Sequence, residues 1–422
     1  MADAALNSAP AHPVLDDVVN LPTAATVRAA QRTLRILHIG KYYPPFAGGI
    51  ENFHYDLVRE QVRQGHAVAS VVHHHERRRA TVSESDGGAT TWRTRILGRV
   101  LFTPIAPGFR SVLRRAVREF QPDVLHFHVP NPSALWAITD AESRGRPWVV
   151  QWQSDVVSSR IERGLVPAYF VYAPLEQLFL RRAAAILVAT PPYLNSSKPL
   201  APWRDKCHVI PLGISPDRLP FPSDESRLHA EQVWQPGFLR VLVIGRLTYY
   251  KGHEIAINAI ARNPNAQLCI VGNGDRFTRL QQLIDQLQLS SRVRLMGSLP
   301  GDQVRALLAT CDCLCLPSLE RTEAFGLVLA EAMRYGKLQV ASDIPGSGVG
   351  WVVERDRTGL LVPPGNVEQL AAALERLQAD PALREKLGRS SADSFQRFDI
   401  GAVASQIEAL YRQVLAGNSL TQ

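Results

Sequence analysis

The chain has 422 residues, of which 45% are hydrophobic and 20% are charged, and its formal net charge at pH 7 is +8. This composition is typical of a soluble globular protein. It contains no run of 18 or more apolar residues, which excludes a membrane-spanning helix. The length is too great for one ordinary core and predicts two domains of roughly 200 residues each.

The first 33 residues are rich in Ala and Pro and lack the basic start and apolar core of a secretory signal. We expect them to form a flexible extension. Among the five cysteines, Cys311, Cys313 and Cys315 alternate, so on a strand all three would face one side. Because no Cys-x-x-Cys pair exists, packing in a core is favoured over metal binding, and a reducing cytosol is the expected compartment.

The positive charge is concentrated in the first half of the chain. Residues 1–200 contain 23 Lys and Arg against 16 Asp and Glu, a net charge of +7, and the remainder, 24 against 23, has +1. A basic half suggests contact with an acidic surface, such as anionic lipid or a diphosphate-bearing acceptor. Ordinary surface charge explains the same count equally well, and both interpretations stay open.

A Rossmann-like unit is predicted at the start of the ordered chain. Residues 34–39 form an apolar strand, a loop containing Gly48 and Gly49 follows, and residues 52–64 have helical spacing. A glycine loop in this place lets the backbone approach a ligand phosphate. Residues 66–72 form a second strand. Residues 73–79 hold three consecutive histidines, which point to alternate sides, so a solvated loop is preferred over a shared metal ion.

Residues 109–120 are predicted to form a basic amphipathic helix. Its apolar positions recur at helical spacing, and Arg110, Arg114, Arg115 and Arg118 lie towards the remaining face. A helix of this type can lie on an anionic membrane. A surface helix packed on its own sheet is the somewhat stronger alternative.

Three more strands are predicted in the first half. Residues 124–127 place His128 at a strand's carboxyl end, where open α/β sheets bind ligands, and we expect His126 to point to the opposite face. Residues 148–153 end in Gln153, two residues before Asp155, and residues 183–190 are apolar. A Pro-rich segment follows at residues 191–206.

The second half repeats the strand–loop–helix pattern. Residues 239–244 are a strand, followed by Arg246 and Lys251 on a loop, where both cations can reach one diphosphate. Further strands are expected near residues 268–272, 293–299, 339–343 and 359–362. Residues 366–416 are helical by pattern.

The most informative stretch follows a short buried strand at residues 313–317. Glu323 lies in the turn before a helix predicted from Leu327 to Tyr335, which Gly336 ends. Phe325, Gly326 and Leu327 offer backbone N–H groups at the helix start, which form a ready anion site. Glu331 lies just over one turn into the helix, so its carboxylate can grip sugar hydroxyls beside the anion. An ordinary loop with two solvated glutamates is the simpler interpretation.

Residues 323–331, Glu-Ala-Phe-Gly-Leu-Val-Leu-Ala-Glu, resemble the Glu-x7-Glu motif of the retaining GT-B glycosyltransferases of family 4. The resemblance covers about residues 34–415 and implies two Rossmann-like domains facing a central cleft. After the extension at 1–33, it implies an acceptor domain at 34–210, a hinge near 210–220, a nucleotide-sugar donor domain at 211–395 and a returning helix at 396–422.

The resemblance also implies roles for residues that match the family motifs. Gly48, Gly49, Arg246 and Lys251 would face the donor diphosphate together with Phe325, Gly326 and Leu327. Glu323 would bind the donor sugar and Glu331 the ribose, and His128 would hold the transferring sugar. Gln153 and Asp155 would lie on the acceptor side. At Gln153 this chain departs from the family pattern, because many relatives carry His at this position.

By resemblance, the expected reaction moves a sugar, mannose from GDP-mannose, onto a glycan or polyprenyl-diphosphate-linked acceptor in surface polysaccharide synthesis. UDP-glucose or UDP-N-acetylglucosamine as donor, a GT-B nucleotide-sugar epimerase and a weakened binding subunit are the alternatives. We expect no metal, no cofactor and no nucleic-acid partner. The expected location is the cytoplasm, with peripheral contact at the inner face of the plasma membrane through the basic first domain left open.

Overall fold

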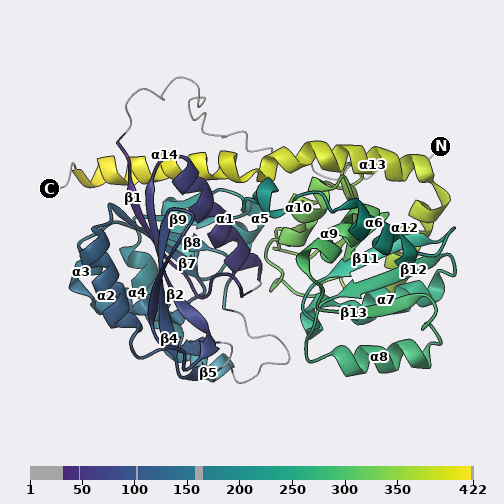
Figure 1. The fold of residues 1–422 in the computed structure, drawn as a ribbon, viewed down its shortest axis with the longest axis horizontal. Helices are drawn as coiled ribbons and strands as arrows, with labels where there is room; N and C mark the ends of the chain where they lie inside the picture. Colours follow the sequence, from purple (N-terminus) through teal and green to yellow (C-terminus); the bar gives the residue numbers. More distant parts are fainter. Residues whose placement is uncertain (1–31, 47, 101–102, 157–164, 420–422) are drawn as a thin grey trace, which may run out of the picture. The chain divides into compact units, whose positions relative to one another are not determined.

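The computed structural model describes residues 32–46, 48–100, 103–156 and 165–419 (Figure 1). Its framework is two sheets. The first has the strand order β10-β9-β8-β7-β1-β2-β4-β3, in which only the β3–β4 pair is antiparallel. The second has the order β13-β12-β11-β14-β15-β16 and is entirely parallel.

The strands of the first sheet are β1 (Arg35–Ile39), β2 (Ala67–Arg77), β3 (Val82–Asp86), β4 (Ala89–Ile96), β7 (Val124–Val129), β8 (Trp148–Trp152), β9 (Ala185–Val188) and β10 (Cys207–Val209). Those of the second sheet are β11 (Leu239–Ile244), β12 (Ala266–Val271), β13 (Val293–Gly297), β14 (Cys313–Leu316), β15 (Leu338–Ser342) and β16 (Gly359–Val362). A separate hairpin pairs β5 (Gly98–Val100) with β6 (Thr103–Ile105).

The α-helices are α1 (Gly49–Arg63), α2 (Phe109–Phe120), α3 (Ala141–Arg144), α4 (Leu165–Arg182), α5 (Pro191–Ser196), α6 (Asp224–Val233), α7 (His253–Arg262), α8 (Phe277–Gln286), α9 (Gly301–Thr310), α10 (Leu327–Arg334), α11 (Val349–Val352), α12 (Val367–Ala379), α13 (Pro381–Ser394) and α14 (Ile400–Ser419). Short 3-10 turns complete the chain at η1 (Pro132–Thr139), η2 (Ala201–Lys206), η3 (Pro216–Arg218), η4 (Tyr249–Lys251) and η5 (Phe395–Phe398).

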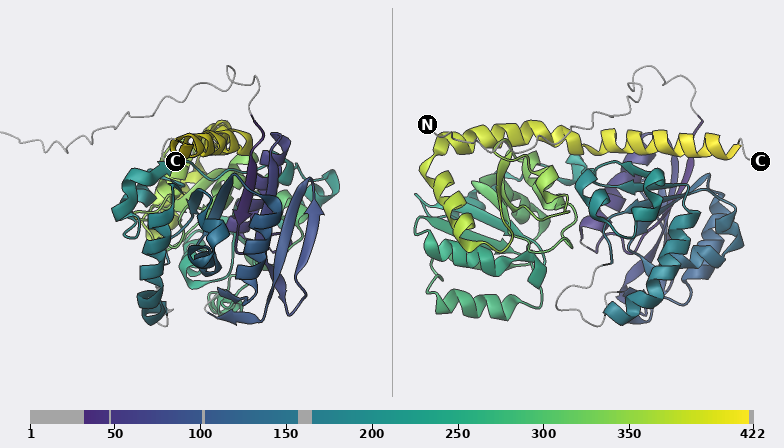
Figure 2. Two further views of the ribbon diagram at one scale, coloured as in Figure 1. Left: turned by 90° about the vertical axis from the view of Figure 1, so that its left-hand side faces the viewer. Right: turned by 180° about the vertical axis from the view of Figure 1, so that it is seen from behind.

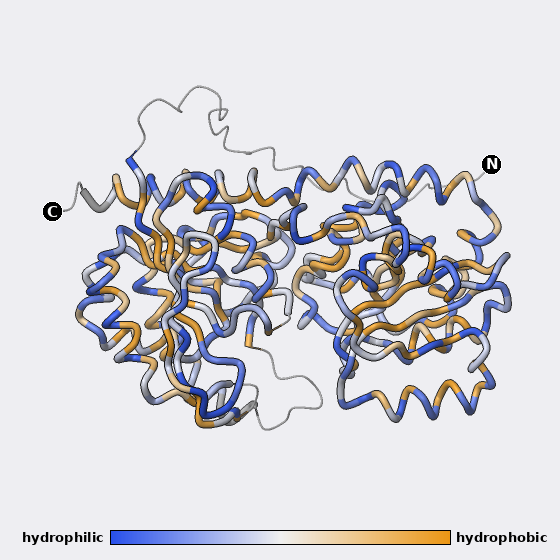
Figure 3. The backbone as a smooth tube through the Cα atoms, viewed as in Figure 1, coloured by the Kyte–Doolittle hydropathy of each residue, from blue (hydrophilic) through white to orange (hydrophobic). Residues whose placement is uncertain are grey.

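Both faces of the central strands of the first sheet are covered, which is why β7, β8 and β9 are mostly apolar and fully buried. Residues of α1 and α14 pack on one face, and residues of α2 and α4 pack on the other. Figure 2 shows helices on either side of these strands, and Figure 3 shows hydrophobic segments in both halves of the chain. The register pairs His38 of β1 with His126 of β7, so the sheet places polar rings side by side in its interior.

The second sheet is also buried on both faces, with α7, α8 and α12 on one and α9, α10 and α11 on the other. All five cysteines are free. Cys313 and Cys315 lie in β14 and pack in one core, whereas Cys311 precedes the strand and packs in the other. The expectation that all three face one side was therefore wrong, because the strand begins two residues after Cys311.

Residues 73–77 correct a second expectation. Instead of a solvated loop they continue β2, paired with β4. His73 is buried, and its ring lies 2.6 Å from the Lys41 carbonyl oxygen and 2.9 Å from the Ser133 hydroxyl. These partners replace water for the imidazole, so a polar residue can extend a buried strand.

Helix α2 has the predicted bounds, and its apolar side chains Phe109, Leu113 and Val117 are buried. Its arginines have partners within the protein: Arg114 contacts Asp140 at 2.7 Å and Arg118 contacts Glu142 at 2.8 Å. The helix therefore packs on its own sheet. In the described residues, no helix is both long and apolar enough to pass through a bilayer.

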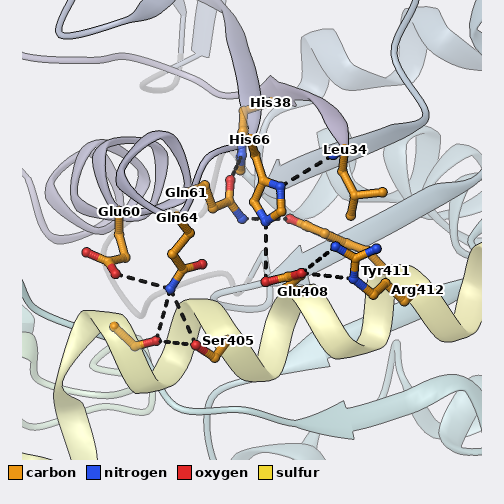
Figure 4. A network of polar contacts seen from close by, with 11 residues as sticks. Leu34, His38, Glu60, Gln61, Gln64, His66, Ser405, Glu408, Tyr411 and Arg412 are labelled. Atoms are coloured by element: carbon orange, nitrogen blue, oxygen red, sulfur yellow. Dashed lines mark hydrogen bonds and ion pairs between the residues drawn. The ribbon is translucent and has the colours of Figure 1, made fainter. Parts of the chain in front are cut away.

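The C-terminal segment crosses from the second sheet to the first. Ile214 and Phe398 share a backbone hydrogen bond of 2.8 Å, and α14 then packs against α1. Figure 4 shows Gln61 of α1 between His38 and Tyr411 of α14. Contacts of this kind join residues 33–422 in one unit, so the limits expected at 210 and 395 stay predictions. Residues 1–31 of the expected extension lie outside the described residues.

Phe398 should be a major source of stability where the C-terminal segment leaves the second sheet. The side chain is fully buried, with its ring 5.7 Å from that of Phe325. We expect Phe398→Ala to lower the free energy of unfolding by about 3–5 kcal/mol in a urea titration. Phe277→Ala, at a ring that is 38% exposed, is the matched control and should cost much less. Equal losses would show that Phe398 does not anchor the segment.

Candidate functional site

The loop between β14 and α10 leads to a helix start that is capped by Gly326. Gly326 caps α10 with φ of +76°, and a Cβ atom there would lie 2.8 Å from side-chain carbons of both Leu316 and Leu329. Only glycine fits this position. Phe325 is buried, so its ring packs in the core and its backbone, not its side chain, faces the loop. The helix start at Leu327 thus presents N–H groups and the positive end of the helix dipole.

Glu323 is buried beside this helix start and is held by two groups. Its Oε2 atom lies 2.5 Å from Lys251 Nζ and accepts a hydrogen bond of 3.0 Å from the Ser318 hydroxyl. Burial lowers the pKa of Lys251, but attraction to Glu323 and Tyr250 outweighs it, so the pKa is raised and the ammonium stays charged. The structure therefore brings together a carboxylate and a cation that are 72 residues apart in sequence.

Two further cations lie near the same loop. Arg246 follows β11, and its side chain is exposed. Lys41 follows β1; burial lowers its pKa, Glu51 opposes that shift and Arg246 adds to it. The sequence analysis assigned Arg246 but gave Lys41 no role. The two cations repel each other, which indicates that the loop after β1 and the loop after β11 both place a positive charge in this region.

The glycine loop before α1 lies against the start of α10. A Cβ atom at Gly49 would lie 3.9 Å from the Cβ of Leu327, and one at Gly48 would overlap the Glu51 carboxylate. A Cβ atom at Gly49 would therefore only be in ordinary van der Waals contact with Leu327, and the overlap at Gly48 is with a side chain of α1 itself. The structure thus brings the predicted residues Gly49 and Leu327 together.

Glu331 faces a cation that the sequence analysis missed. Arg218, in the hinge segment, lies 3.2 Å from Glu331 and 2.9 Å from Asp56 of α1. Burial raises the pKa of Asp56, while Arg218 and the Ser215 N–H oppose that shift. No local pattern in the sequence marks Arg218, because its two partners are 113 and 162 residues away.

Asp155 is fully engaged within the protein. It accepts hydrogen bonds from the Trp152 indole at 2.8 Å and the Ser197 hydroxyl at 2.7 Å, and it pairs with Arg321 at 2.7 Å. Arg321 lies two residues before Glu323 and stacks over Tyr193 with its guanidinium carbon 4.1 Å from the ring centre. Asp155 therefore connects the end of β8 with the loop that carries Glu323.

His128 is buried within β7, with 1% of its surface exposed. Its Nε2 atom lies 3.0 Å from His38 Nδ1, and Gln153 Nε2 approaches its Nδ1 atom at 3.5 Å. His126 was expected on the opposite face, which was wrong: residues two apart on a strand share a face. The two rings stack with centres 4.6 Å apart.

One group of side chains among the described residues has the composition of a metal site. His38, His126 and His128 each offer a nitrogen, and these nitrogens lie within 4.8 Å of one another. All three rings are buried, and burial lowers the pKa of each, that of His38 to about 4, so they are neutral. Neutral imidazoles are metal ligands, but they also form hydrogen-bonded chains.

Removing the Arg218 guanidinium should destabilise the protein in a pH-dependent way. In Arg218→Gln, Asp56 stays buried without its cation, and we expect a loss of about 3–5 kcal/mol in the free energy of unfolding at pH 8. The variant raises the pKa of folded Asp56 further, so the folded state then binds the proton more tightly than the unfolded state. The loss should therefore shrink as pH falls towards the unfolded value of about 3.9.

The measurement is a set of urea titrations between about pH 4.5 and pH 8, which lies above the unfolded pKa of about 3.9 and covers the direction in which the pKa of Asp56 is raised. Arg357→Gln is the matched control, because Arg357 is 61% exposed and pairs with Glu354 on the surface. Arg357→Gln should lower the free energy of unfolding only slightly at any pH. A loss for Arg218→Gln that does not vary with pH would rule out the charge of Asp56 as its cause.

Comparison with known families matches both halves of the chain. Residues 48–213 match the model described as "Glycosyl transferase 4-like domain", and residues 224–393 match the model "Glycosyl transferases group 1".

Curated relatives match over most of their length. The D-rhamnosyltransferase WbpZ of Pseudomonas aeruginosa is 28% identical, over 85% of this chain and 90% of that protein. The O-antigen chain mannosyltransferase C of Escherichia coli is 27% identical, over 86% and 94%. The phosphatidyl-myo-inositol mannosyltransferase of Mycobacterium leprae is 30% identical, over 77% and 82%.

Solved structures share the fold. The sucrose-phosphate synthase of Thermosynechococcus elongatus superposes with a TM-score of 0.74 at 23% identity, covering 91% of this chain and all of that one. Anabaena HepE in complex with UDP-glucose superposes with a TM-score of 0.69 at 20% identity, covering 90% and all. The fold is therefore GT-B, as predicted. The chain belongs to the group 1 glycosyltransferases and is a glycosyltransferase enzyme.

Proposed function

We propose that this enzyme transfers mannose from GDP-mannose, with retention of anomeric configuration, to a glycan or polyprenyl-diphosphate-linked acceptor in surface polysaccharide synthesis. The observation that carries the proposal is the pairing of Lys251 with Glu323 beside the start of α10. This places a cation, a carboxylate and a helix N-terminus at one point. A nucleotide-sugar site needs all three: a cation for the diphosphate, a carboxylate for the sugar hydroxyls, and a helix N-terminus for the negative charge that develops on the leaving diphosphate.

In this proposal Arg246 and Lys251 bind the donor diphosphate with the α10 N-terminus. As the bond from the sugar to the diphosphate breaks, negative charge grows on the phosphate oxygens, and fixed cations and N–H groups stabilise it. Lys251 is already charged and held by Glu323 at 2.5 Å. It therefore needs little reorganisation. These groups supply the charge that a metal would otherwise provide, so we propose that catalysis needs no metal.

The two glutamates have separate roles in the proposal. Glu323 binds hydroxyls of the donor sugar, and Glu331 binds the ribose. Both carboxylates have partners of their own, Lys251 and Arg218, which orient them as hydrogen-bond acceptors. Neither is assigned as a covalent nucleophile; substitution on the same face of the sugar fits this set of residues. His128 and Gln153 lie at the ends of β7 and β8, on the acceptor side.

The names of the relatives support the choice of donor. Two of the three curated relatives are described as mannosyltransferases and the third as a D-rhamnosyltransferase. The structure of HepE with UDP-glucose supports the rival donor class, because the same fold holds a uracil nucleotide there. An epimerase, or a weakened subunit with Gln153 in place of histidine, would use the same phosphate site without net transfer to an acceptor.

A nucleotide panel tests the donor site. Wild type and Lys251→Ala are compared by thermal shift with GDP, UDP, GDP-mannose and UDP-glucose. A ligand at about 100 times its dissociation constant should stabilise wild type by roughly 2.7 kcal/mol. We expect a guanine-selective shift. In Lys251→Ala the affinity for GDP and GDP-mannose should fall together by roughly tenfold to a hundredfold, because one charge-assisted contact is lost.

Lys386→Ala is the matched control, since it removes an exposed lysine of the same half of the chain. A uracil-selective shift would support the transferase activity but replace GDP-mannose with a UDP-sugar as the donor. An unchanged affinity for GDP in Lys251→Ala would overturn the diphosphate assignment. Release of GDP that depends on acceptor, with the anomeric configuration of the product read by NMR, separates transfer from epimerisation and from simple binding.

We also propose that the enzyme contacts the anionic inner face of the plasma membrane, through α4 and not α2. The described side chains of α4 include Phe170, 78% exposed, and Val171, 73% exposed, with Leu175 and Leu178 further along the same side. Arg181 and Arg182 follow at the end of the helix. An apolar stripe that ends in arginines suits the boundary between acyl chains and anionic headgroups.

Vesicle sedimentation tests this contact. Phe170→Ser combined with Leu175→Ser should weaken binding to vesicles that contain anionic phospholipid by more than about tenfold, because a large apolar side chain withdrawn from water contributes about 1.5–3 kcal/mol. Leu228→Ser, at a leucine that is 65% exposed on α6, is the control and should bind as wild type does. Equal binding by wild type, the double variant and the control would show that α4 does not contact the membrane.

A further inference from the structure

A continuous chain of polar contacts runs through the interior from the end of β8 to α14. It consists of Gln153, His128, His38, Gln61, Tyr411 and His126, and we call it the histidine chain. Every side chain in it is at least 95% buried. Its members come from five parts of the fold: the end of β8, the central strands β7 and β1, and the helices α1 and α14.

The direction of donation along the histidine chain follows from Gln61. Its Oε1 atom can only accept, so the Nε2 atom of His38, 2.8 Å away, carries the proton. Because His38 is neutral, its Nδ1 atom has the lone pair and accepts from His128 Nε2 at 3.0 Å. His128 is also neutral, so its Nδ1 atom has a lone pair that faces the Gln153 amide at 3.5 Å.

The other end of the histidine chain is consistent with the same direction. The amide nitrogen of Gln61 donates to the Tyr411 hydroxyl at 3.3 Å. Burial raises the pKa of Tyr411, so the phenol keeps its proton and donates it to His126 Nδ1. His126 is then protonated at Nε2, which has no partner in the described part of the chain. The contacts from Gln153 to His126 thus form one sequence of donors and acceptors.

A metal ion shared by the histidines fits the geometry poorly. The planes of His126 and His128 differ by 10°, and the plane of His38 differs from each of them by 26°. The lone pairs of an imidazole lie in its ring plane, so nearly parallel stacked rings direct them side by side and not to one point. The nitrogens of His38 and His128 that would bind the ion instead face each other at 3.0 Å.

We propose that Gln61 and Tyr411 are positioning residues, which hold His128 as the tautomer with its proton on Nε2 and its lone pair on Nδ1, towards Gln153. Reversal of the chain requires the amides of Gln61 and Gln153 to turn over and all three imidazoles to exchange tautomer together. The C-terminal helix, through Tyr411, therefore controls which nitrogen of His128 can accept a proton, or a hydrogen bond from a hydroxyl group. The consequence for turnover rests on the proposed function, whereas the tautomer itself does not.

Tyr411→Phe and Gln61→Leu test the proposal, with Gln61→Glu as the rescue. The protein is labelled with 15N-histidine, and His128 is assigned by loss of its signal in His128→Gln. 15N NMR distinguishes the protonated nitrogen from the lone-pair nitrogen. In wild type we expect His128 protonated at Nε2. Tyr411→Phe leaves the Gln61 amide free to turn, and Gln61→Leu removes the acceptor of His38, so both should give a mixture of tautomers. Gln61→Glu keeps that acceptor and should restore the wild-type signal.

Steady-state kinetics provides the second measurement. Tyr411→Phe and Gln61→Leu should lower kcat by about fivefold with the KM for donor unchanged, the size expected for one hydrogen bond. Gln61→Glu should recover most of it. Tyr335→Phe is the matched control, because it removes one phenol hydrogen bond, to the Pro220 carbonyl at 3.0 Å, from the other half of the chain. It should change neither the His128 signal nor kcat.

Three results would overturn the proposal: a wild-type His128 protonated at Nδ1, a Tyr411→Phe spectrum identical to that of Tyr335→Phe, or a stoichiometric metal in the purified protein that shifts all three histidines. A wild-type protein that transfers no sugar would instead count against the proposed function, and the NMR measurement would still decide the tautomer.

Discussion

The site depends on Arg218, which lies between two carboxylates from different helices. Asp56 of α1 has 1% of its side chain exposed, and Glu331 of α10 has 16%. Two such carboxylates would repel each other, and the repulsion grows as water is excluded. The guanidinium contacts both, so α1 and α10 can approach. The close approach of Gly49 and Leu327 is a consequence, because each lies at the start of one of these helices. The hinge segment that carries Arg218 is thus part of the site and not only a connection.

The same principle recurs at each carboxylate of the site. Glu323 has Lys251, Glu331 has Arg218 and Asp155 has Arg321. A partly buried carboxylate without a cation would take up a proton or force its loop towards water. Its cation fixes the position of the carboxylate, which suits hydroxyl recognition. In the proposed donor site, the diphosphate shares Lys251 with Glu323. That sharing links the sugar-binding and phosphate-binding parts of the proposed donor site, since movement of either group displaces the other.

Local patterns in the sequence were enough for the elements that carry the site. Strand β14, helix α10 and the cap at Gly326 follow from apolar spacing and glycine placement within about 20 residues. The interior polar contacts are different in kind. Arg218, Gln61 and Tyr411 are marked by no local signal, because their partners lie 23 to 350 residues away. His126 was misplaced for a simpler reason, neglect of the two-residue period of a strand. Residues 73–77 were misjudged because the partners that allow histidine in a buried strand, such as Ser133, come from another element.

Helix α14 takes part in both long-range arrangements of the structure. Its first residues pair with the hinge, where the backbone of Ile400 donates to the Ile214 carbonyl at 3.2 Å. Three turns later Tyr411 closes the histidine chain in the first sheet. Ile214 is four residues from Arg218, so a shift of the hinge would act on α14 and on α10 together. A rigid helix transmits such a shift along its axis, and Tyr411 would then change its distance from Gln61. The hydrogen bond between them is 3.3 Å long, longer than the contacts of His38 with Gln61 and with His128. In the proposed arrangement its rupture would release the tautomer of His128 without unfolding any element.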